Sequence, residues 1–257
     1  MRRFIPRQHP FYHEPRFAFG YELLPENVKV LDYGCHDGAF GQRLTRHKKV
    51  EYLGVDKNRD AVRRAPPGIL VKELVHPLPF DDAEFDAVTM FEVIEHIYDQ
   101  DAVLREVHRV LKPGGIVIVS VPRRHVFTVL DLANFKFVFP RLHRLYYSLT
   151  RSPAAYRERY LTNPHGLVGD VEREKRWHQH FRDDEMRSLL ERNGFSVEEM
   201  DGSGLFSLVI TFLTYILRLG FLFPQRVHDW DSHTFHSSGL LCAARKPAGR
   251  AAHEPAS

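Results

Sequence analysis

The chain has 257 residues, of which 43% are hydrophobic and 27% are charged, a composition that excludes an intrinsically disordered protein and indicates a globular one. Its formal net charge of +3 is too small to indicate a nucleic-acid partner by itself. Two cysteines exclude a disulfide framework, and residues 1–17 lack the continuous apolar core of a secretory signal, so we expect a cytoplasmic protein.

The two ends of the chain differ from the rest in composition. Proline, arginine, histidine and aromatic residues dominate positions 1–27. Two interpretations are open for this segment: an amino-terminal arm that folds over the domain as a short cap, or a partly ordered tail. At the other end, residues 247–257 are small and include proline, and we expect them to be disordered.

The first strong structural signal lies at Val28–Leu44. Its β-branched and leucine residues predict a buried strand, and its last residues predict the first turns of an amphipathic helix. Between them, Gly34 and Gly38 permit backbone angles and close approaches that a side chain would block. This pattern begins a nucleotide-type βαβ unit, with an acid in place at Asp32. A nicotinamide dinucleotide is disfavoured, because Asp37 would repel its diphosphate at the start of the helix.

A second predicted strand, Val50–Asp56, also ends in an acid. Asp56 follows Gly38 at close to the roughly 20-residue spacing at which a carboxylate meets the ribose hydroxyls in nucleotide-binding βαβ units. A carboxylate suits that task, because it can accept hydrogen bonds from both vicinal hydroxyls. We therefore predict that Asp56 binds a ribose.

Strand and helix patterns alternate along the following part of the chain. The predicted elements are strands at Ile69–Glu73, Phe85–Met90 and Ile116–Val121, a helix at Asp101–Leu111, and a closing strand at Ser238–Arg245. The sequence Lys-Pro-Gly-Gly at 112–115 is expected to stop the helix. Such alternation predicts a doubly wound α/β sheet, with its ligand at the carboxyl ends of the strands.

Five runs in this order carry a resemblance to a known family: LDYGCHDGAFG, YLGVDKN, PLPFDDAEFDAVTMFEVIEH, LREVHRVLKPGGIVIVSVPR and FRDDEMRSLLERNGFSV. They resemble class I S-adenosylmethionine-dependent methyltransferases, the broad group that includes ubiquinone-pathway and sugar or lipid methyltransferases. The resemblance implies a Rossmann-like sheet that is mostly parallel with an antiparallel last strand. It also implies a methyltransferase domain formed by residues 28–122 and 181–246.

The resemblance implies that S-adenosyl-L-methionine is the cofactor. The residues that it assigns to cofactor binding are Asp32, Gly34, Cys35, Gly38, Asp56, Lys57, Glu73 and Phe91. The first four would cradle the methionine part, Asp56 the ribose, and Glu73 the adenine amino group, where aspartate is more usual. Phe91, with Met90 before it, would offer ring and backbone contacts. One departure is His36, because the family commonly has glycine there.

The candidate catalytic residues follow the fourth predicted strand, in Glu92-Val93-Ile94-Glu95-His96. At helical spacing, Glu92, Glu95 and His96 would lie close to one face, near the methyl group. A hydroxyl acceptor must lose a proton, and an imidazole has a suitable unperturbed pKa for taking it. We therefore predict His96 and Glu92 as catalytic residues.

The same run also resembles the metal-binding motif of small-RNA 3′-end 2′-O-methyltransferases and of some ubiquinone-pathway O-methyltransferases. Glu92, Glu95 and His96 could hold a divalent ion together with a histidine from residues 177–181, such as His180. Relatives without a metal share the run, so the preferred interpretation has no metal, and the metal set stays an alternative.

Residues 123–180 form a predicted insertion after the fifth strand, where such enzymes usually carry a substrate cap. Arg123–Arg159 contains eight Lys or Arg residues against two acids, interleaved with aromatic residues. These residues could bind RNA through phosphate contacts and stacking, or a phosphorylated lipid or anionic membrane. A helical cap with its aromatic residues in a small core is an equally good interpretation.

A second insertion, at 205–223, is unusually apolar. Leu205–Leu217 has no charged residue over 13 positions, which is too short for a membrane span of about 20 residues. We expect a helix buried against the domain, with peripheral membrane contact as the alternative.

These observations predict an S-adenosylmethionine-dependent methyltransferase that methylates an oxygen of a small-molecule or lipid-linked acceptor. The alternatives are a metal-dependent RNA 2′-O-methyltransferase and a non-catalytic cofactor-binding protein. The acceptor itself does not follow from the sequence, because function on this fold resides in variable insertions.

Overall fold

The computed structural model describes residues 5–162, 177–215 and 224–248. Its centre is a seven-stranded sheet in the order β3-β2-β1-β4-β5-β7-β6. The strands are β1 (Val28–Tyr33), β2 (Val50–Asp56), β3 (Val71–Glu73), β4 (Phe85–Phe91), β5 (Leu111–Pro122), β6 (Ser196–Ser203) and β7 (Gly239–Arg245). Strands β1 to β5 are parallel, and β7 is antiparallel to both β5 and β6. The predicted Rossmann-like sheet with an antiparallel last strand is confirmed.

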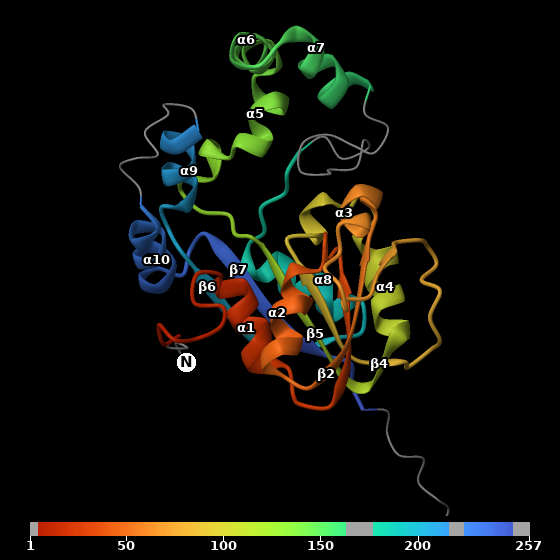
Figure 1. The fold of residues 1–257 in the computed structure, drawn as a ribbon. Helices are drawn as coiled ribbons and strands as arrows, with labels where there is room; N and C mark the ends of the chain where they lie inside the picture. The colour runs from red at the N-terminus through yellow and green to blue at the C-terminus, as the bar shows by residue number, and fades with distance from the viewer. Residues whose placement is uncertain (1–4, 163–176, 216–223, 249–257) are drawn as a thin grey trace, which may run out of the picture.

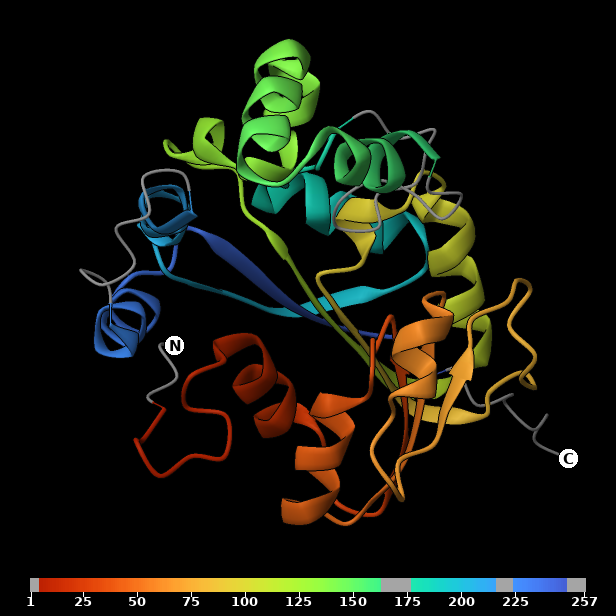
Figure 2. The same cartoon turned by 45° about the horizontal axis from the view of Figure 1, so that its top comes forward.

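Helices cover both faces of the sheet (Figure 1). The α-helices are α1 (Pro15–Leu23), α2 (Ala39–His47), α3 (Arg59–Arg63), α4 (Gln100–Val110), α5 (Leu132–Val138), α6 (Pro140–Thr150), α7 (Pro153–Tyr156), α8 (Asp183–Arg192), α9 (Ser207–Tyr215) and α10 (Gln225–Thr234). Shorter turns are η1 (Ile94–His96), η2 (Thr128–Leu130) and the π-helical η3 (Arg157–Thr162). One core lies under α4 and α8, and the other under α1 and α2, on the opposite face (Figure 2).

The turn between α4 and β5 differs in detail from the prediction. The Asp99 side chain caps α4 by accepting a hydrogen bond from the Ala102 amide at 2.9 Å. The helix ends at Val110 and β5 starts at Leu111, so residues 112–115 lie inside the strand. They form an irregularity in the β4–β5 pairing. Phe85 pairs with Leu111 and Ala87 pairs with Ile116, so two residues along β4 correspond to five residues along β5. The predicted strand at 116–121 is therefore only the regular part of β5.

The amino-terminal segment packs on the domain as an arm. Phe11 is fully buried, and Phe19 of α1 is 3% exposed. The Phe11 ring lies 5.4 Å from the ring of Phe40 in α2, centroid to centroid. Arm and helix thus share one apolar core over β1 and β4, and residues 5–24 belong to the fold.

The helices of the 123–180 insertion stand at the carboxyl ends of the parallel strands, where α5, α6 and α7 form the green lobe at the top of Figure 1. Their aromatic residues form a small core around His143, whose ring lies 4.8 Å from Tyr160 and 5.7 Å from Tyr156. The insertion is therefore a helical cap whose aromatic residues pack in a small core, which is one of the interpretations that the sequence left open. Positions 163–176 of this insertion lie outside the described residues.

The apolar insertion at 205–223 contains α9, in which Ile210 is 4% exposed and its described neighbours are partly buried. Its positions 216–223, like the predicted tail from residue 249 onward, lie outside the described residues. Among the helices that are described, none combines the length and hydrophobicity needed to cross a bilayer.

Candidate active site

A cavity of about 360 Å³ opens at the carboxyl ends of β1, β2 and β4, where the sequence predicts cofactor binding. The predicted site residues that line it are Gly34, Asp56, Lys57, Phe91, Glu92 and His96, and His36 lines it too. A parallel sheet brings these residues together, because each strand ends at the same edge.

The turn from β1 to α2 depends on left-handed backbone angles. Gly34 and Gly38 have φ of +78° and +80°, and a Cβ on Gly34 would lie 2.4 Å from a methyl carbon of Val93. His36 has φ +53°, in the region that glycine occupies at least cost. A glycine, which the family resemblance implies at this position, would adopt this angle at less cost. The His36 side chain is 57% exposed, so it points away from the turn and does not fill it. The cost of a histidine at this position is therefore backbone strain.

Asp56 lies at the end of β2 and is 8% exposed. One of its oxygens accepts a hydrogen bond from the His36 amide at 2.7 Å, and the other accepts one from the Asn58 amide at 2.8 Å. Because each carboxylate oxygen has more than one acceptor site, both can also accept from a ribose hydroxyl. The two amides hold the carboxylate at the cavity wall.

Asp32 has a supporting position instead. It is 2% exposed and does not line the cavity. Its carboxylate accepts hydrogen bonds from the Tyr52 hydroxyl and the Thr89 hydroxyl, each at 2.7 Å. Burial raises the pKa of Asp32 to about 6, although these two hydrogen bonds oppose the shift. Asp32 therefore ties β1 to β2 and β4 beneath the turn.

Two other predicted cofactor residues also lie away from the cavity wall. The Cys35 thiol packs under Gly54, where an added Cβ would lie 2.5 Å from the sulfur, and burial raises the pKa of this thiol well above its usual range. Glu73 accepts a hydrogen bond from Arg59 at 2.7 Å. Neither side chain lines the cavity, and Leu74 lies there in place of Glu73. The direct contacts predicted for Cys35 and Glu73 therefore have no support in this cavity.

The predicted helical face of Glu92, Glu95 and His96 is wrong. Only η1 forms there, one 3₁₀ turn over 94–96, and Glu92 has a left-handed φ of +56°. That conformation lets the Glu92 carboxylate accept a hydrogen bond from the Ser120 hydroxyl at 2.7 Å, while the Glu92 amide donates to the Ser120 carbonyl at 3.0 Å. Glu92 and His96 line the cofactor cavity, whereas Glu95 is fully buried.

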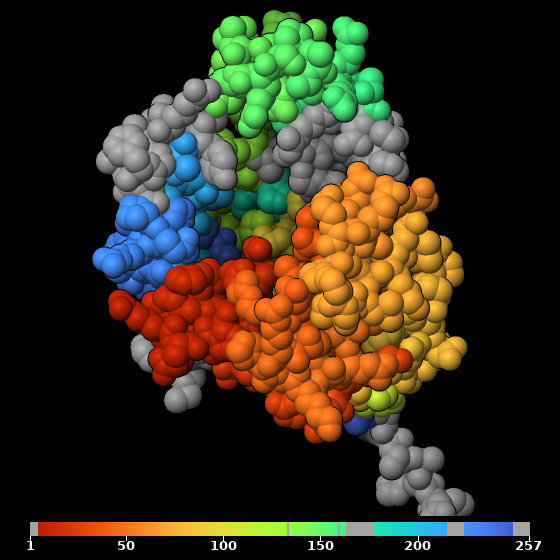
Figure 3. Space-filling model, viewed as in Figure 1, coloured from red at the N-terminus to blue at the C-terminus, as the bar shows by residue number. Residues whose placement is uncertain are grey.

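A second cavity, of about 490 Å³, adjoins the first. The two share Glu92, and the second continues to Asp131, His178 and His180. The space-filling view shows the molecule hollowed below the α5–α7 lobe, above the amino-terminal elements (Figure 3). Among the described residues, Glu92 is the one titratable side chain that lines both cavities. We therefore take the second cavity as the candidate acceptor site.

Imidazoles and carboxylates gather where the cavities meet. Asp131 contacts His178 Nδ1 at 2.7 Å and His180 Nε2 at 3.5 Å. The Glu95 Oε1 atom lies 3.5 Å from His96 Nε2 and 4.0 Å from His178 Nε2. Burial lowers the pKa of His180 to about 4, with Asp131 opposing the shift.

The described residues offer two groups of potential metal ligands, Glu95-His96-His178 and Asp131-His178-His180. The predicted set of Glu92, Glu95, His96 and His180 is not one of them, since Glu92 belongs to neither group and His180 only to the second. Sequence reasoning missed Asp131, an isolated acid in a basic insertion. It noted His178 only as part of a histidine-rich run.

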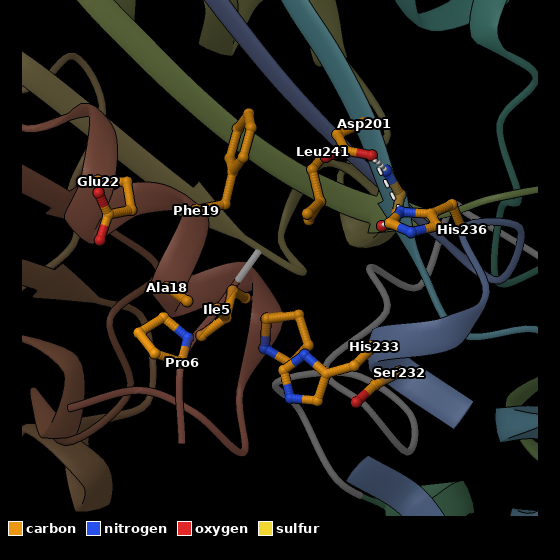
Figure 4. A pocket seen from close by; sticks show the side chains of 12 residues that line it. Ile5, Pro6, Ala18, Phe19, Glu22, Asp201, Ser232, His233, His236 and Leu241 are labelled. Atoms are coloured by element: carbon orange, nitrogen blue, oxygen red, sulfur yellow. Dashed lines mark hydrogen bonds and ion pairs between the residues drawn. The ribbon is translucent and has the colours of Figure 1, made fainter. Parts of the chain in front are cut away.

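A third cavity, of about 370 Å³, lies between α1, which contributes Ala18 and Phe19, and α10, which contributes Ser232 and His233 (Figure 4). It shares Pro15, Ser232 and Leu241 with the acceptor cavity. On its wall His236 contacts Asp201 at 3.1 Å. The space beside the candidate acceptor site therefore extends between α1 and α10.

The sheet order, the glycine turn and the acid at the end of β2 define the class I methyltransferase fold. Comparison with known proteins agrees, since the profile of a methyltransferase-domain family matches residues 3–200. The chain therefore belongs to this methyltransferase-domain family.

The relatives match only part of this chain. A probable S-adenosylmethionine-dependent methyltransferase of Mycolicibacterium smegmatis is 35% identical over 38% of this chain and 40% of its own. A ubiquinone biosynthesis O-methyltransferase of Alkalilimnicola ehrlichii is 31% identical over 45% of this chain and 52% of its own. The chain thus matches about half, or less, of the length of these relatives. A crystal structure of an S-adenosylmethionine-dependent methyltransferase from Mesorhizobium loti has the same fold, with a TM-score of 0.56, 18% identity, and coverage of 91% of this chain and 97% of its own.

Proposed function

We propose that the protein transfers the methyl group of S-adenosyl-L-methionine to an oxygen atom of a small-molecule or lipid-linked acceptor. The observation that carries this proposal is the junction of two cavities at Glu92. One cavity has the features of a cofactor site, and the other contains histidines and a carboxylate that suit a hydroxyl. Methyl transfer requires the donor carbon and the acceptor oxygen to meet in line, and two adjoining cavities provide that arrangement.

The residues of the first cavity fit the cofactor. Gly34 lines the cavity and, having no Cβ, also leaves room for Val93 behind the turn; Asp56 can accept both ribose hydroxyls, and Phe91 offers an apolar surface. When bound, the cofactor supplies a methyl group on a positively charged sulfur. Lys57 lines the cavity near Asp56, as the family resemblance implies. This chain's own contribution is to bind the cofactor and orient it toward the second cavity.

Glu92 is the proposed proton acceptor. It lines both cavities, and its hydrogen bond from Ser120 fixes the carboxylate at their junction. The left-handed backbone at Glu92 costs free energy, and strained residues of this kind gather at functional sites. His96 lines the cofactor cavity and is proposed to assist from that side. The likeness to a relative named as a ubiquinone biosynthesis O-methyltransferase supports an oxygen acceptor.

The test is Glu92→Gln, which keeps an oxygen that can accept from Ser120 but removes the base. We expect turnover to fall by about 100-fold or more, with cofactor affinity within twofold of the wild type by calorimetry. Acceptors would be a panel of phenols, quinols and isoprenoid-linked hydroxyl compounds, followed by release of S-adenosylhomocysteine. Glu51→Gln, on an exposed strand end, is the matched control. Methyl transfer to nitrogen or carbon compounds alone, or full activity of Glu92→Gln, would contradict the proposal.

The alternatives have less support. The RNA 2′-O-methyltransferase alternative rests on the set of Glu92, Glu95, His96 and His180, which does not form one ligand group. A non-catalytic binding protein would be favoured if His36 distorted the cofactor turn, but His36 has a left-handed φ of +53° that a glycine would also adopt, and Gly34 and Gly38 keep their left-handed angles beside it. For a lipid-linked acceptor, we also propose that residues 205–223 contact the lipid surface. Flotation with anionic liposomes, with and without deletion of that segment, would test it.

A further inference from the structure

The third cavity, between α1 and α10, has a wall with several acidic and imidazole side chains. Twelve residues line it, and all of them belong to the described part of the chain. The polar side chains among them are those of Glu22, Asp201, Ser232, His233 and His236. Figure 4 shows Glu22 on the side of α1 and Asp201, beside His236, across the cavity. No Lys or Arg belongs to this described wall, so its two carboxylates give it a negative charge.

Both histidines of the wall use their ring N–H group within the protein. His236 Nδ1 donates to the Gly202 carbonyl at 2.6 Å and contacts the Asp201 carboxylate at 3.1 Å. His233 Nε2 donates to the Tyr12 carbonyl at 2.9 Å. Because a carbonyl only accepts, the proton of each neutral ring is fixed on the nitrogen that contacts the carbonyl. The other nitrogen, Nε2 of His236 and Nδ1 of His233, is therefore a hydrogen-bond acceptor.

The remaining polar side chains of the wall also offer acceptors. The Ser232 hydroxyl donates to the Asp229 carbonyl at 3.2 Å, and its oxygen can still accept. Glu22 Oε1 lies 3.0 Å from His9 Nε2, whereas Oε2 has no hydrogen-bond partner among the described residues. The same holds for Asp201, where Oδ1 makes every contact with the described residues. The side chains of the wall thus offer acceptors and no unused donor.

Cationic side chains near the wall have other partners. The Lys48 ammonium donates to two backbone carbonyls at the end of α1. The Arg123 guanidinium is paired with Asp183 at 2.7 Å and donates to the backbone carbonyl of His236. Neither Lys48 nor Arg123 lines the cavity, so neither occupies the space between its two carboxylates.

A ligand that complements this wall must donate hydrogen bonds and carry positive charge. A protonated amine offers three N–H donors and no acceptor, whereas a carboxylate would be repelled. Hydrogen bonds that involve a charged group are also roughly twice as strong as those between neutral groups. Ala18, Phe19 and Leu241 give the cavity an apolar side that suits a hydrocarbon chain. We propose that the third cavity binds a protonated amine and holds the amino end of an elongated acceptor.

The third cavity continues the candidate acceptor cavity. The two have Pro15, Ser232 and Leu241 in common, and their volumes are about 370 and 490 Å³. One elongated molecule would thus extend from the junction at Glu92 to the amine subsite. The acceptor class is then an amino alcohol or an amino sugar, with its hydroxyl at Glu92. This assignment to the acceptor rests on the proposed function, whereas amine binding in the cavity does not.

The first test compares three ligands that differ at one end only: 6-amino-1-hexanol, 1,6-hexanediol and 6-hydroxyhexanoate. Each is titrated at neutral pH into the full-length chain without cofactor, and the Gly202 amide signal reports binding by NMR. We expect the amino alcohol to bind about 10-fold or more tightly than the diol, and hydroxyhexanoate not to bind. Asp201→Asn should weaken amino-alcohol binding by about 10-fold or more, and the more exposed Glu22→Gln by about threefold. Glu198→Gln, on β6 but outside the cavity, is the matched control.

Equal binding of the amino alcohol and the diol overturns the amine site, even if methyl transfer is found. Unchanged affinity in Asp201→Asn and Glu22→Gln also overturns it, and Glu22→Gln decides alone should Asp201→Asn fail to fold. Arg2 and Arg3 precede the wall residue Ile5 in the sequence, so a variant with both arginines changed to glutamine is titrated as well. Binding that appears only in that variant would assign the wall to the chain's own guanidinium groups and overturn the proposal.

The second test concerns the acceptor and follows release of S-adenosylhomocysteine. For an amino alcohol that is methylated, N-acetylation should raise KM by about 10-fold or more in the wild type but not in Asp201→Asn. Equal KM values for the free and acetylated forms would overturn the assignment to the acceptor. Amine binding in the cavity without turnover of any amino alcohol would overturn it too, and the proposed function would still be decided separately by Glu92→Gln.

Discussion

The buried carboxyl group of Asp32 predicts a specific dependence of stability on pH. Burial raises the pKa of Asp32 to about 6 from an ordinary value of 3.8. The folded state therefore favours the protonated carboxyl group. At low pH, where Asp32 is protonated, this preference contributes fully to the free energy of unfolding. It is lost as pH rises from about 4 through about 6, when the folded state must hold a buried charge. The full loss is about 3 kcal/mol, at 1.36 kcal/mol per pKa unit.

Asp32→Asn removes the titration and isolates this effect. Between pH 4.5 and 7.5, the unfolding free energy of the wild type should fall by about 2 kcal/mol relative to the variant, since part of the loss has occurred by pH 4.5. Subtracting the variant cancels the other titrating groups. Urea unfolding followed by circular dichroism at both pH values, without cofactor, measures the difference.

A companion substitution tests the cause. Thr89 donates a hydrogen bond to Asp32 at 2.7 Å, which favours the charged carboxylate. Thr89→Val keeps the volume and removes the donor, so the loss of stability should extend above pH 6. A difference between wild type and Asp32→Asn that stays constant with pH would refute the reasoning. It would mean that the Tyr52 and Thr89 hydroxyls hold the carboxylate in its charged form.

Two further predictions concern the cofactor turn. His36→Gly should raise the free energy of unfolding by about 1 kcal/mol, because a φ of +53° is strained for histidine and not for glycine; an unchanged or lower melting temperature would contradict this. Asp56→Ala should weaken S-adenosylmethionine binding by about 100-fold or more in calorimetry, because two hydrogen bonds to a charged acceptor are lost. Unchanged affinity would show that the ribose binds elsewhere, and Asp60→Ala, exposed on α3, is the matched control.

The cavity that we propose for the cofactor could be located from the sequence, because the residues that form it are set by local structure. Gly34 and Gly38 are required by the backbone of one turn, and Asp56 ends the strand whose spacing from that turn is fixed by the βαβ unit. The positions of residues in such a unit depend on the unit itself and not on the insertions elsewhere in the chain. The same local reasoning placed Cys35 and Glu73 at the cofactor. It could not tell that their side chains turn into the scaffold or toward Arg59.

The acceptor side was not predictable, because its determinants are distant in sequence. Helical spacing suggested one face for Glu92, Glu95 and His96, but hydrogen bonds to Ser120 of β5 draw Glu92 into a left-handed conformation. No periodicity within the segment encodes that contact. The pairing of Asp131 with His178 joins positions 47 residues apart across an insertion, and a composition of basic and aromatic residues gives no sign of it.

If the two cavities have the roles that we propose, a change in the insertion would alter acceptor choice without disturbing cofactor binding. Asp131 and His178 both belong to the 123–180 insertion. His178 lies near Glu95, and Asp131 contacts His178, because the cap stands over the carboxyl end of β4. A change of cap sequence would therefore replace half of the titratable groups at the junction and leave Gly34 and Asp56 in place. Substitutions in the cap should therefore change turnover with a given acceptor, while cofactor affinity stays the same. The cap would then choose the acceptor.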